Sequence, residues 1–282
     1  MNQGKHAPIQ TLCKIFKVSR SGYYEWLGHR PAPRERENAQ LLKDIYDSFY
    51  HFKGIYGHRR IRMYINRTQG TNHSLQKIRR LMNILGLKAF IRRSNEHSTK
   101  KDKDAEVAAN HLKRKFKADH PHQKLVTDVT HLRYGAGKKA YLCIFKDLYD
   151  GAIVTYNVSK NNDNPLVMET LKDYIKAYPE AKPLIHSDRG SQYTSKEYRR
   201  RTTQAEMQVS MSRVGKCIDN APAETFFGHY KHEDYYFKQY TGYQALVDDI
   251  DQYMDFYNNH RYQEKLNCLA PSEFNARYQA AA

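Results

Sequence analysis

Residues 125–130 read Leu-Val-Thr-Asp-Val-Thr, a run of apolar and β-branched residues that predicts a buried strand. Asp128 stands in the middle of this run, although aspartate is disfavoured inside strands. A buried carboxylate without a partner is costly, and a metal ion offsets that cost. The run therefore predicts a central strand and places a candidate metal ligand on it.

The segments that follow favour an α/β layer. Two further strands are predicted at 141–145 and 153–158, the second after an Asp-Gly turn. Helix and strand signals then alternate, and they predict a helix at 164–178, a strand at 183–186, a helix at 195–205, a strand at 207–210 and a long helix opening at 220–222. Three successive strands followed by this alternation indicate a mixed sheet covered by helices.

Two more carboxylates are placed where they can join Asp128. Asp188 follows the strand at 183–186, at the kind of strand end where α/β sheets bind ligands. Glu224 falls in the first turn of the last predicted helix, with 35 residues between it and Asp188. On position alone, each carboxylate is more often a cap or an ion-pair partner. Their joint placement favours a site for hard divalent cations, which prefer oxygen ligands.

The first 90 residues are predicted to be helical. Apolar periodicity indicates a short helix-turn-helix-like unit at 9–26 and further helices at 41–49, 59–65 and 75–82. Ser74 is the expected N-cap of the last of these helices. A basic third helix fits a helix-turn-helix whose third helix enters the major groove. The basic residues Lys77, Arg79 and Arg80 fit equally well as the solvated face of an amphipathic helix.

The positive charge of the chain lies in its first half. The net charge is +17, and residues 1–117 hold 26 of the 47 lysines and arginines but only 9 of the 30 acidic residues. Residues 118–282 therefore hold 21 of each and are neutral. This asymmetry predicts a polyanionic partner for the first half. Nucleic acid is favoured over an anionic membrane, because the charges do not follow one face of a lone amphipathic helix.

Composition excludes several other classes of protein. No apolar run approaches the roughly 18 residues of a membrane span, and the first six residues lack the apolar stretch of a secretory signal. The four cysteines stand far apart, without a C-x-x-C pair, and so predict neither a disulfide framework nor a cysteine-based zinc site. We therefore expect a reducing cytoplasm and no membrane partner.

Three motifs in this chain resemble the catalytic signatures of bacterial insertion-sequence transposases. They lie at 125–131, 186–193 and 210–227 and carry Asp128, Asp188 and Glu224. The 35-residue spacing and Lys231, seven residues after Glu224, are also typical of that family. The resemblance is to the second-reading-frame (OrfB) product of the IS-three family of DDE transposases, and it extends from about Ile9 to Phe274.

The resemblance implies a fold, an activity and a cofactor. The fold is an α/β class with a ribonuclease-H-like, retroviral-integrase-like mixed-sheet core after an all-α helix-turn-helix region. The implied domains are a helical DNA-binding region at 1–90, a linker at 91–120, a catalytic core at 121–235 and a C-terminal helical extension at 236–282. The implied activity is metal-dependent DNA cleavage and strand transfer, with two Mg²⁺ or Mn²⁺ ions held by the three carboxylates.

The resemblance also implies partners. They are the terminal inverted repeats of the element, the target DNA and further copies of the chain, in the nucleoid of a bacterial cytoplasm. An upstream-frame product, fused to the chain or acting with it, is a further implied partner.

Several residues are expected to touch DNA. Lys231 shares a helix face with Glu224 and is placed to meet a phosphate near the metals. Other candidates lie on the loops beside the catalytic carboxylates and on the helical region; these are Gln192, Tyr193, Arg213, Lys216, Arg59, Arg60, Lys77 and Arg80. Gln192 and Tyr193 alternatively hold their loop. Asn220 is expected to be first a helix cap, and His186 is expected to be a packed, hydrogen-bonded histidine rather than a ligand.

Three positions depart from the family pattern, and two other functions stay open. The family usually has tryptophan at Leu125, an aromatic residue at Ile218 and glycine at Cys268. None of these departures removes a predicted metal ligand. The alternatives to a transposase are a DNA-binding repressor derived from one, which has lost catalysis, and a nuclease of the same core that hydrolyses DNA without joining it.

Overall fold

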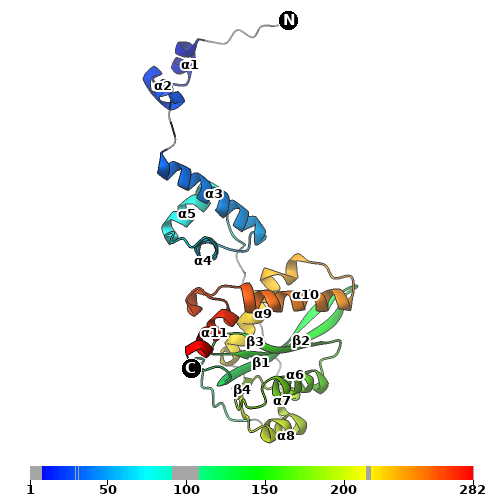
Figure 1. Ribbon diagram of the computed structural model, residues 1–282. Coiled ribbons are helices and arrows are strands. Elements are labelled where there is room, and N and C mark those ends of the chain that lie inside the picture. The colour runs from blue at the N-terminus through cyan, green and yellow to red at the C-terminus, as the bar shows by residue number, and fades with distance from the viewer. Residues whose placement is uncertain (1–7, 29, 31, 91–107, 214–216, 282) are drawn as a thin grey trace. The chain divides into compact units, whose positions relative to one another are not determined.

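The computed structural model describes residues 8–28, 30, 32–90, 108–213 and 217–281. The chain divides into two compact units, Met1–Ala89 and Phe90–Ala282, which are described separately (Figure 1). None of the described helices is both long and apolar enough to span a membrane.

The first unit, here called the helical unit, is built from α1 (Ile9–Ile15), α2 (Arg20–Gly28), α3 (Pro33–His51), α4 (His58–Gln69) and α5 (Leu75–Ile84). Helix α3 is longer than the predicted 41–49, because Pro33 occupies its first turn and the Glu35 carboxylate accepts a hydrogen bond from the Ala32 amide at 2.9 Å. Helices α3 to α5 share an apolar core that includes Ile45, Ile61 and Ile78, all with 0% exposure.

A short turn joins α4 to α5 and gives them the form of a helix-turn-helix. Gly70 ends α4 in the left-handed conformation with φ +63°, which glycine adopts at little cost. Ser74 begins α5, and its side chain accepts a hydrogen bond from the Lys77 amide at 3.2 Å. The predicted N-cap is therefore confirmed, and α5 presents Ile78, Leu81 and Met82 to the core.

The second unit, here called the catalytic unit, contains one five-stranded mixed sheet. Its strands are β1 (Lys124–Tyr134), β2 (Lys138–Asp147), β3 (Ile153–Ser159), β4 (Leu184–Ser187) and β5 (Gln208–Met211), in the order β3-β2-β1-β4-β5. Strand β2 pairs antiparallel with both β1 and β3, whereas β4 pairs parallel with both β1 and β5. The predicted mixed sheet is confirmed, and its topology is that of a ribonuclease-H-like fold.

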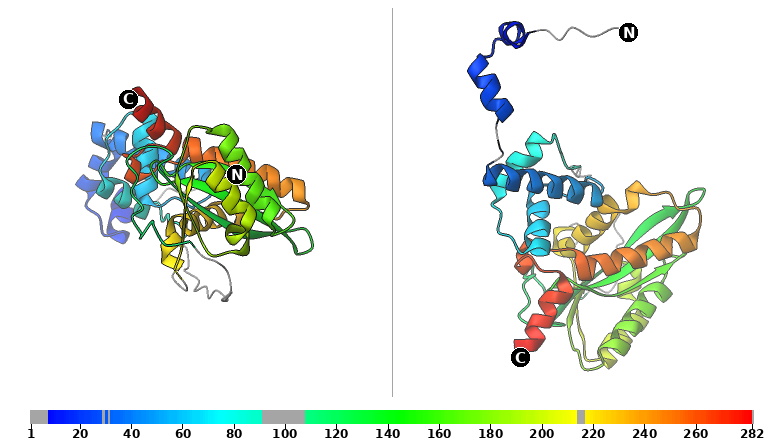
Figure 2. Two further views of the ribbon diagram at one scale, coloured as in Figure 1. Left: turned by 90° about the horizontal axis from the view of Figure 1, so that it is seen from below. Right: turned by 45° about the horizontal axis from the view of Figure 1, so that its top comes forward.

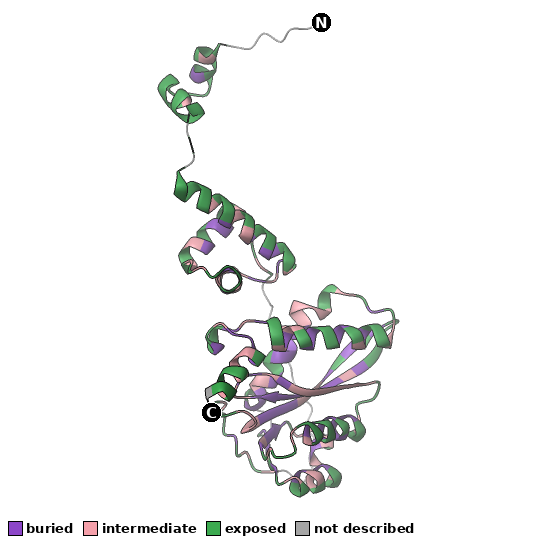
Figure 3. Ribbon diagram, viewed as in Figure 1, coloured by how far each residue is buried: buried purple, intermediate pink, exposed green. Residues whose placement is uncertain are grey.

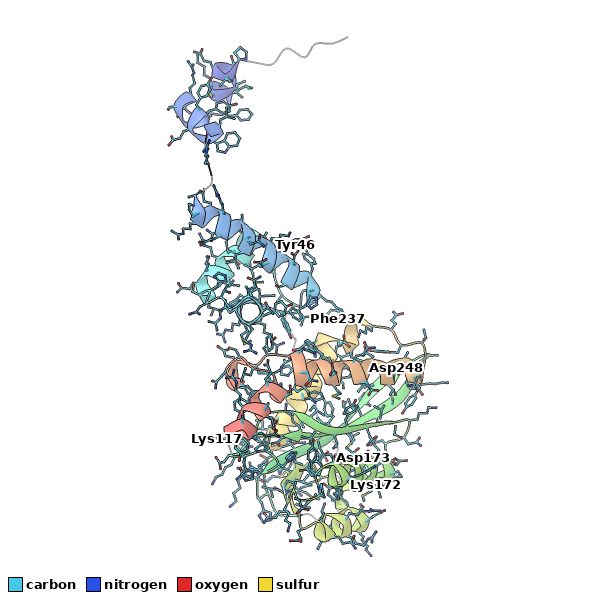
Figure 4. The ribbon with its side chains drawn as sticks, viewed as in Figure 1. Tyr46, Lys117, Lys172, Asp173, Phe237 and Asp248 are labelled. Atoms are coloured by element: carbon cyan, nitrogen blue, oxygen red, sulfur yellow. The ribbon has the colours of Figure 1, made fainter. Side chains whose placement is uncertain are left out.

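Helices cover both faces of this sheet (Figures 1 and 2). Helices α6 (Asn164–Ala177) and α8 (Lys196–Gln204) pack on one face, and α9 (Ala221–Glu233) and α10 (Tyr243–Asp255) pack on the other. Alternation along β1 explains the two cores: Leu125 contributes to the first and Val126 to the second. The middle strands β1, β2 and β4 are largely buried, and α6 and α10 turn exposed residues such as Asp173 and Asp248 away from the sheet (Figures 3 and 4).

The core of the catalytic unit also includes residues outside 121–235. Leu112, from the described part of the predicted linker, is 1% exposed and packs with α9. Leu246 and Tyr253 of α10 belong to the same cluster. Short helical segments flank α9 and α10. Segment η1 (Cys217–Asn220) precedes α9, η2 (Tyr235–Phe237) lies between α9 and α10, and η3 (Phe256–His260), η4 (Glu264–Leu266) and α11 (Pro271–Ala281) follow α10.

Candidate active site

Asp128 lies on the central strand β1 and faces α9. Alternation along β1 puts Val126, Asp128 and Thr130 on the face that α9 covers, and Val126 packs there with Phe226 of that helix. The Asp128 carboxylate is half-buried, and its Oδ1 accepts a hydrogen bond from the Val129 amide at 2.8 Å. A charged group therefore stands at the middle of an otherwise apolar strand.

Asp188 directly follows β4, the strand next to β1. The two strands are parallel, with Val126 opposite His186, so Asp128 and Asp188 lie at equivalent positions two residues further on. The Asp188 Oδ1 accepts a hydrogen bond from the Gly190 amide at 2.9 Å. A Cβ atom on Gly190 would lie 2.8 Å from Gln192 Oε1 and 3.2 Å from Asp188 Oδ1, so a larger residue there would displace these two side chains.

Helix α9 carries Glu224 and Lys231. Glu224 is in the first turn and exposed, and Lys231 lies two turns later and is half-buried. The Lys231 Nζ donates a hydrogen bond to Thr130 Oγ1 at 2.7 Å, on the same face of β1 as Asp128. Helix α9 therefore brings a carboxylate and an ammonium group to the strand that carries Asp128.

The carboxylates act on one another electrostatically. Burial raises the pKa of Asp128 well above its usual value, and the charges of Asp188 and Glu224 raise it further, while the Val129 amide and Lys231 oppose the shift. Partial burial of its carboxyl group raises the pKa of Asp188 as well, although the residue as a whole is exposed to solvent. Burial lowers the pKa of Lys231, and the charge of Asp128 opposes this effect.

This arrangement fits a divalent cation by its chemistry. Three carboxylates supply hard oxygen donors, and a cation among them would counter the burial and the neighbouring negative charges that raise the Asp128 pKa. Within the described ranges, no three acidic, histidine or cysteine side chains are gathered closely enough to form a complete metal cage. The carboxylates are neighbours in the fold, with Glu224 on the solvent side.

His186 is enclosed by hydroxyl groups and is neutral. Its Nδ1 lies 2.8 Å from Ser210 Oγ, and its Nε2 lies 3.1 Å from Ser212 Oγ. Because Ser210 Oγ accepts hydrogen bonds from two backbone amides, its own proton goes to Nδ1, which leaves Nε2 as the donor. Burial lowers the pKa of His186 to about 4. These contacts place His186 in the core as a packed residue.

Arg213 is held by a buried aspartate that sequence reasoning missed. Its Nε and Nη2 donate to the two carboxylate oxygens of Asp219, at 2.9 and 3.0 Å. Asp219 also accepts from Arg114 Nε at 2.7 Å and from Asn110 Nδ2 at 3.0 Å. The Arg213 side chain, mainly, holds the pKa of Asp219 well below its usual range. These hydrogen bonds attach the segment just before α9 to residues more than 100 positions earlier in the chain. No pattern in the sequence predicts them.

The loop after Asp188 places its two predicted DNA contacts differently. Tyr193 is 1% exposed, and its hydroxyl lies 3.0 Å from Thr127 Oγ1, which favours the alternative expectation that it holds the loop. Gln192, by contrast, is half-buried and donates to Asn162 Oδ1 at 2.9 Å. Lys216 lies outside the described residues.

The structure gives the departures from the family pattern a physical setting. Cys268 has φ +61°, a left-handed conformation that favours glycine, which the family usually has there. Leu125 is fully buried beneath α6, where a smaller side chain replaces the usual tryptophan. Ile218 is 58% exposed, so its difference from an aromatic residue changes a surface rather than the core.

The basic residues of the helical unit differ in exposure. Arg59 and Arg80 are exposed, Lys77 is half-buried, and the guanidinium of Arg60 lies over the Tyr56 ring at 5.0 Å. The outer face of α5 bears a shallow hollow, lined by Gln76, Arg79, Arg80, Asn83 and Ile84. This face contains no acidic residue and combines the side chains that read guanine and adenine in the major groove.

Comparison with known families gives three matches. Residues 118–217 and 205–271 match two family models described as an integrase core domain. Residues 35–95 match a model described as an HTH-like domain. The matches coincide with α3 to α5 in the helical unit and with the mixed sheet and α9 in the catalytic unit.

Two relatives match almost the whole chain. The chain is 32% identical over 268 residues to a protein assigned as transposase InsK of insertion sequence element IS150 of Escherichia coli (strain K12), covering 95% of this chain and 93% of that protein. It is also 32% identical over 273 residues to a 31 kDa protein of insertion element IS600 of Shigella sonnei, covering 96% and 100%.

Among solved structures, the catalytic core domain of HTLV-2 integrase, determined with magnesium, matches with 20% identity and a TM-score of 0.44, over 56% of this chain and 98% of that one. The sequence relationship decides the assignment. The chain belongs to the insertion-sequence transposases of the IS-three family, second-reading-frame type, which are DDE polynucleotidyl transferases of DNA integration and recombination.

Proposed function

We propose that Asp128, Asp188 and Glu224 hold two divalent metal ions, Mg²⁺ or Mn²⁺, and that the chain uses them to cleave an insertion sequence at its ends and join it to target DNA. The observation that carries this proposal is geometric: Asp128 and Asp188 stand at equivalent positions on the neighbouring parallel strands β1 and β4, and α9 brings Glu224 to the face of β1 that carries Asp128. When bound, such ions polarise the scissile phosphate and activate the attacking oxygen.

The protein groups have separate tasks in this reaction. Asp128 and Asp188, on neighbouring parallel strands, provide a rigid pair of ligands, and Glu224 completes the set from the solvent side when DNA is present. Lys231, anchored on Thr130 at 2.7 Å, places a positive charge beside the carboxylates, where it can orient a phosphate of the DNA strand. Gln192, Arg213 and Lys216 are further candidate contacts to the DNA backbone.

The helical unit recognises the DNA. Helix α5 is the recognition helix, with Arg79, Arg80, Gln76 and Asn83 facing base edges, and Arg59 of α4 meets phosphate. Lys77 and Arg60, which are partly covered, contribute through charge rather than direct readout. The sequences read in this way are the terminal inverted repeats of the element.

The active assembly contains more than one chain, because two DNA ends must be joined to one target. The product of an upstream reading frame is a further partner, and the assembly acts at the bacterial nucleoid. Two comparisons of complex size test the multimer and the upstream-frame partner. The first compares this chain with and without end DNA, and the second compares it with and without the upstream-frame product.

The test uses labelled element ends, the purified full chain and Mg²⁺. Asp188→Asn is expected to abolish both cleavage and joining, because the ligand pair on β1 and β4 is broken, while end binding stays within about twofold. Joined products from this variant would contradict the proposal. Wild-type protein that binds ends without cutting indicates a repressor, and nicked but unjoined strands indicate a nuclease.

A further inference from the structure

Three buried residues stand beside the three candidate metal ligands in the sequence. Thr127 directly precedes Asp128 on β1, Tyr193 follows Asp188 by five residues in α7 (Ser191–Thr194), and Asn220 precedes Glu224 by four residues at the start of α9. Their exposed fractions are 0%, 1% and 3%. Each therefore lies inside the protein at the point where its element delivers a carboxylate.

Two hydrogen bonds connect these residues through Thr127. The Thr127 hydroxyl lies 3.0 Å from the Tyr193 hydroxyl, and the Asn220 amide Nδ2 donates to the Thr127 carbonyl oxygen at 3.1 Å. The first bond ties β1 to the loop that carries Asp188. The second ties β1 to the helix that carries Glu224.

Alternation along β1 allows one residue to make both links. The Thr127 side chain points to the sheet face that carries α6 and α7, while Asp128 points to the opposite face. The backbone carbonyl of Thr127 does not depend on which face the side chain takes, and its oxygen accepts the hydrogen bond from the Asn220 amide. The residue before Asp128 is therefore held by the Asn220 amide, and the Asp128 carboxylate itself accepts a hydrogen bond from the amide of the next residue, Val129.

Asn220 occupies the N-cap position of α9 but does not cap it with its side chain. Asparagine at this position ordinarily accepts a hydrogen bond from the first turn of the helix. Here its amide reaches across to β1, and its Oδ1 is buried without a hydrogen-bond partner among the described residues. A buried oxygen without a hydrogen bond destabilises the protein, and α9 lacks the side-chain cap that Asn220 could provide. The hydrogen bond to Thr127 is therefore made at the expense of the stability of the start of α9.

We propose that Thr127, Tyr193 and Asn220 form a positioning bridge that sets the spacing of Asp128, Asp188 and Glu224 and so tunes metal affinity. The bridge touches neither DNA nor the reacting atoms. It rests on the proposed role of the three carboxylates as ligands. It differs from ordinary core packing because its loss changes the metal dependence of the reaction rather than stability alone.

The experiment measures strand-transfer rate against Mg²⁺ concentration at saturating end DNA, with thermal unfolding of each variant in parallel. Thr127→Val keeps the shape of the side chain and removes its hydroxyl, and Tyr193→Phe removes the other end of the same bond. Each is expected to raise the half-saturating Mg²⁺ concentration about tenfold. Thr127→Ser keeps the hydroxyl and is expected to rescue the wild-type dependence.

Double variants identify the links. Thr127→Val with Tyr193→Phe is expected to match either single variant, because both remove one bond, whereas Thr127→Val with Asn220→Ala exceeds both, because two bonds are lost. Thr127→Val and Tyr193→Phe variants that lose thermal stability but keep the wild-type Mg²⁺ dependence would overturn the bridge. Asp188→Asn in the same assay separates the two proposals: joined products there overturn the ligand assignment and the bridge with it.

Discussion

The helical unit and the catalytic unit differ in where they place charged side chains that matter to their proposed roles. In the helical unit, α5 exposes Arg79 and Arg80, and its hollow contains no acidic side chain. The catalytic unit also holds charged groups in its interior: Arg261 is 2% exposed and donates to both oxygens of Glu233, at 2.8 and 2.7 Å. Lys231 and Asp128 are half-buried neighbours.

In the proposed function, this contrast separates affinity for DNA from chemistry on DNA. Exposed cations gain free energy by releasing counterions from the phosphate backbone, and they need no fixed partner in the protein. Carboxylates that bind metal must instead be fixed within a folded frame, which requires burial and a network that holds each element in place. The predictions below test whether the two units depend on different interactions, from the largest expected effect to the smallest.

The buried ion pair of the catalytic unit is expected to give the largest change in stability. Arg261→Met leaves the Glu233 carboxylate buried without its guanidinium partner and is expected to cost about 3–5 kcal/mol of unfolding free energy. The matched control is Lys182→Met, which breaks the exposed Lys182–Glu206 pair and is expected to leave the midpoint unchanged. Urea denaturation of the full chain compares the unfolding midpoints of the two variants. Equal midpoints would show that the buried pair stabilises the protein no more than the exposed one.

The pH dependence of the catalytic unit is expected to come partly from Asp147. Burial, and then the charge of Asp150, raise the pKa of this fully buried carboxyl to about 6. The folded state therefore holds the proton more tightly than the unfolded state, so this contribution to stability is present below about pH 4 and is lost as pH rises to about 6. The loss amounts to about 3 kcal/mol.

Asp147→Asn removes this titration and is the matched control. Its unfolding free energy is expected to be flatter than that of wild type between pH 4 and pH 6, measured by denaturation at fixed temperature. A wild-type curve that runs parallel to that of the variant across this range would show that Asp147 titrates normally.

The recognition face of α5 is expected to affect binding without affecting folding. Arg79→Ala and Arg80→Ala each remove a candidate base contact and are expected to weaken end binding by roughly tenfold while reducing discrimination against unrelated DNA. Arg59→Ala, on α4, removes a phosphate contact and is expected to weaken binding to all sequences alike. Fluorescence anisotropy with specific and unrelated duplexes measures both, and identical losses on the two duplexes would exclude base reading by α5.

The smallest effects compare the same cap in the two units. Ser74 caps α5 and Ser195 caps α8, each through a hydrogen bond of 3.2 Å to a backbone amide. Ser74→Ala and Ser195→Ala are each expected to cost about 1 kcal/mol. Calorimetry of the full chain is expected to show each variant lowering only the transition of its own unit, and a common shift of a single transition would show that the units unfold together.

Local patterns are sufficient for much of the fold and for naming the candidate ligands. The β-branched run around Asp128, the Asp-Gly turn before β3 and the N-cap Ser74 each indicate a backbone conformation through neighbouring residues alone. Asp188 and Glu224 could be proposed because a strand end and a helix start are recognisable in sequence. The extent of α3 was underestimated, since its first turns are polar and lack the apolar periodicity that marks the rest.

The sequence by itself determined the order of strands and helices, the uneven charge and the candidate ligands, because these depend on local propensity and composition. Only the tertiary structure decided that Tyr193 is buried on Thr127, that Arg213 and Arg114 share Asp219, and that Asn220 reaches β1 instead of capping α9. Such contacts join residues up to 105 positions apart, and their partners are selected by how the sheet and helices pack, which no single segment encodes.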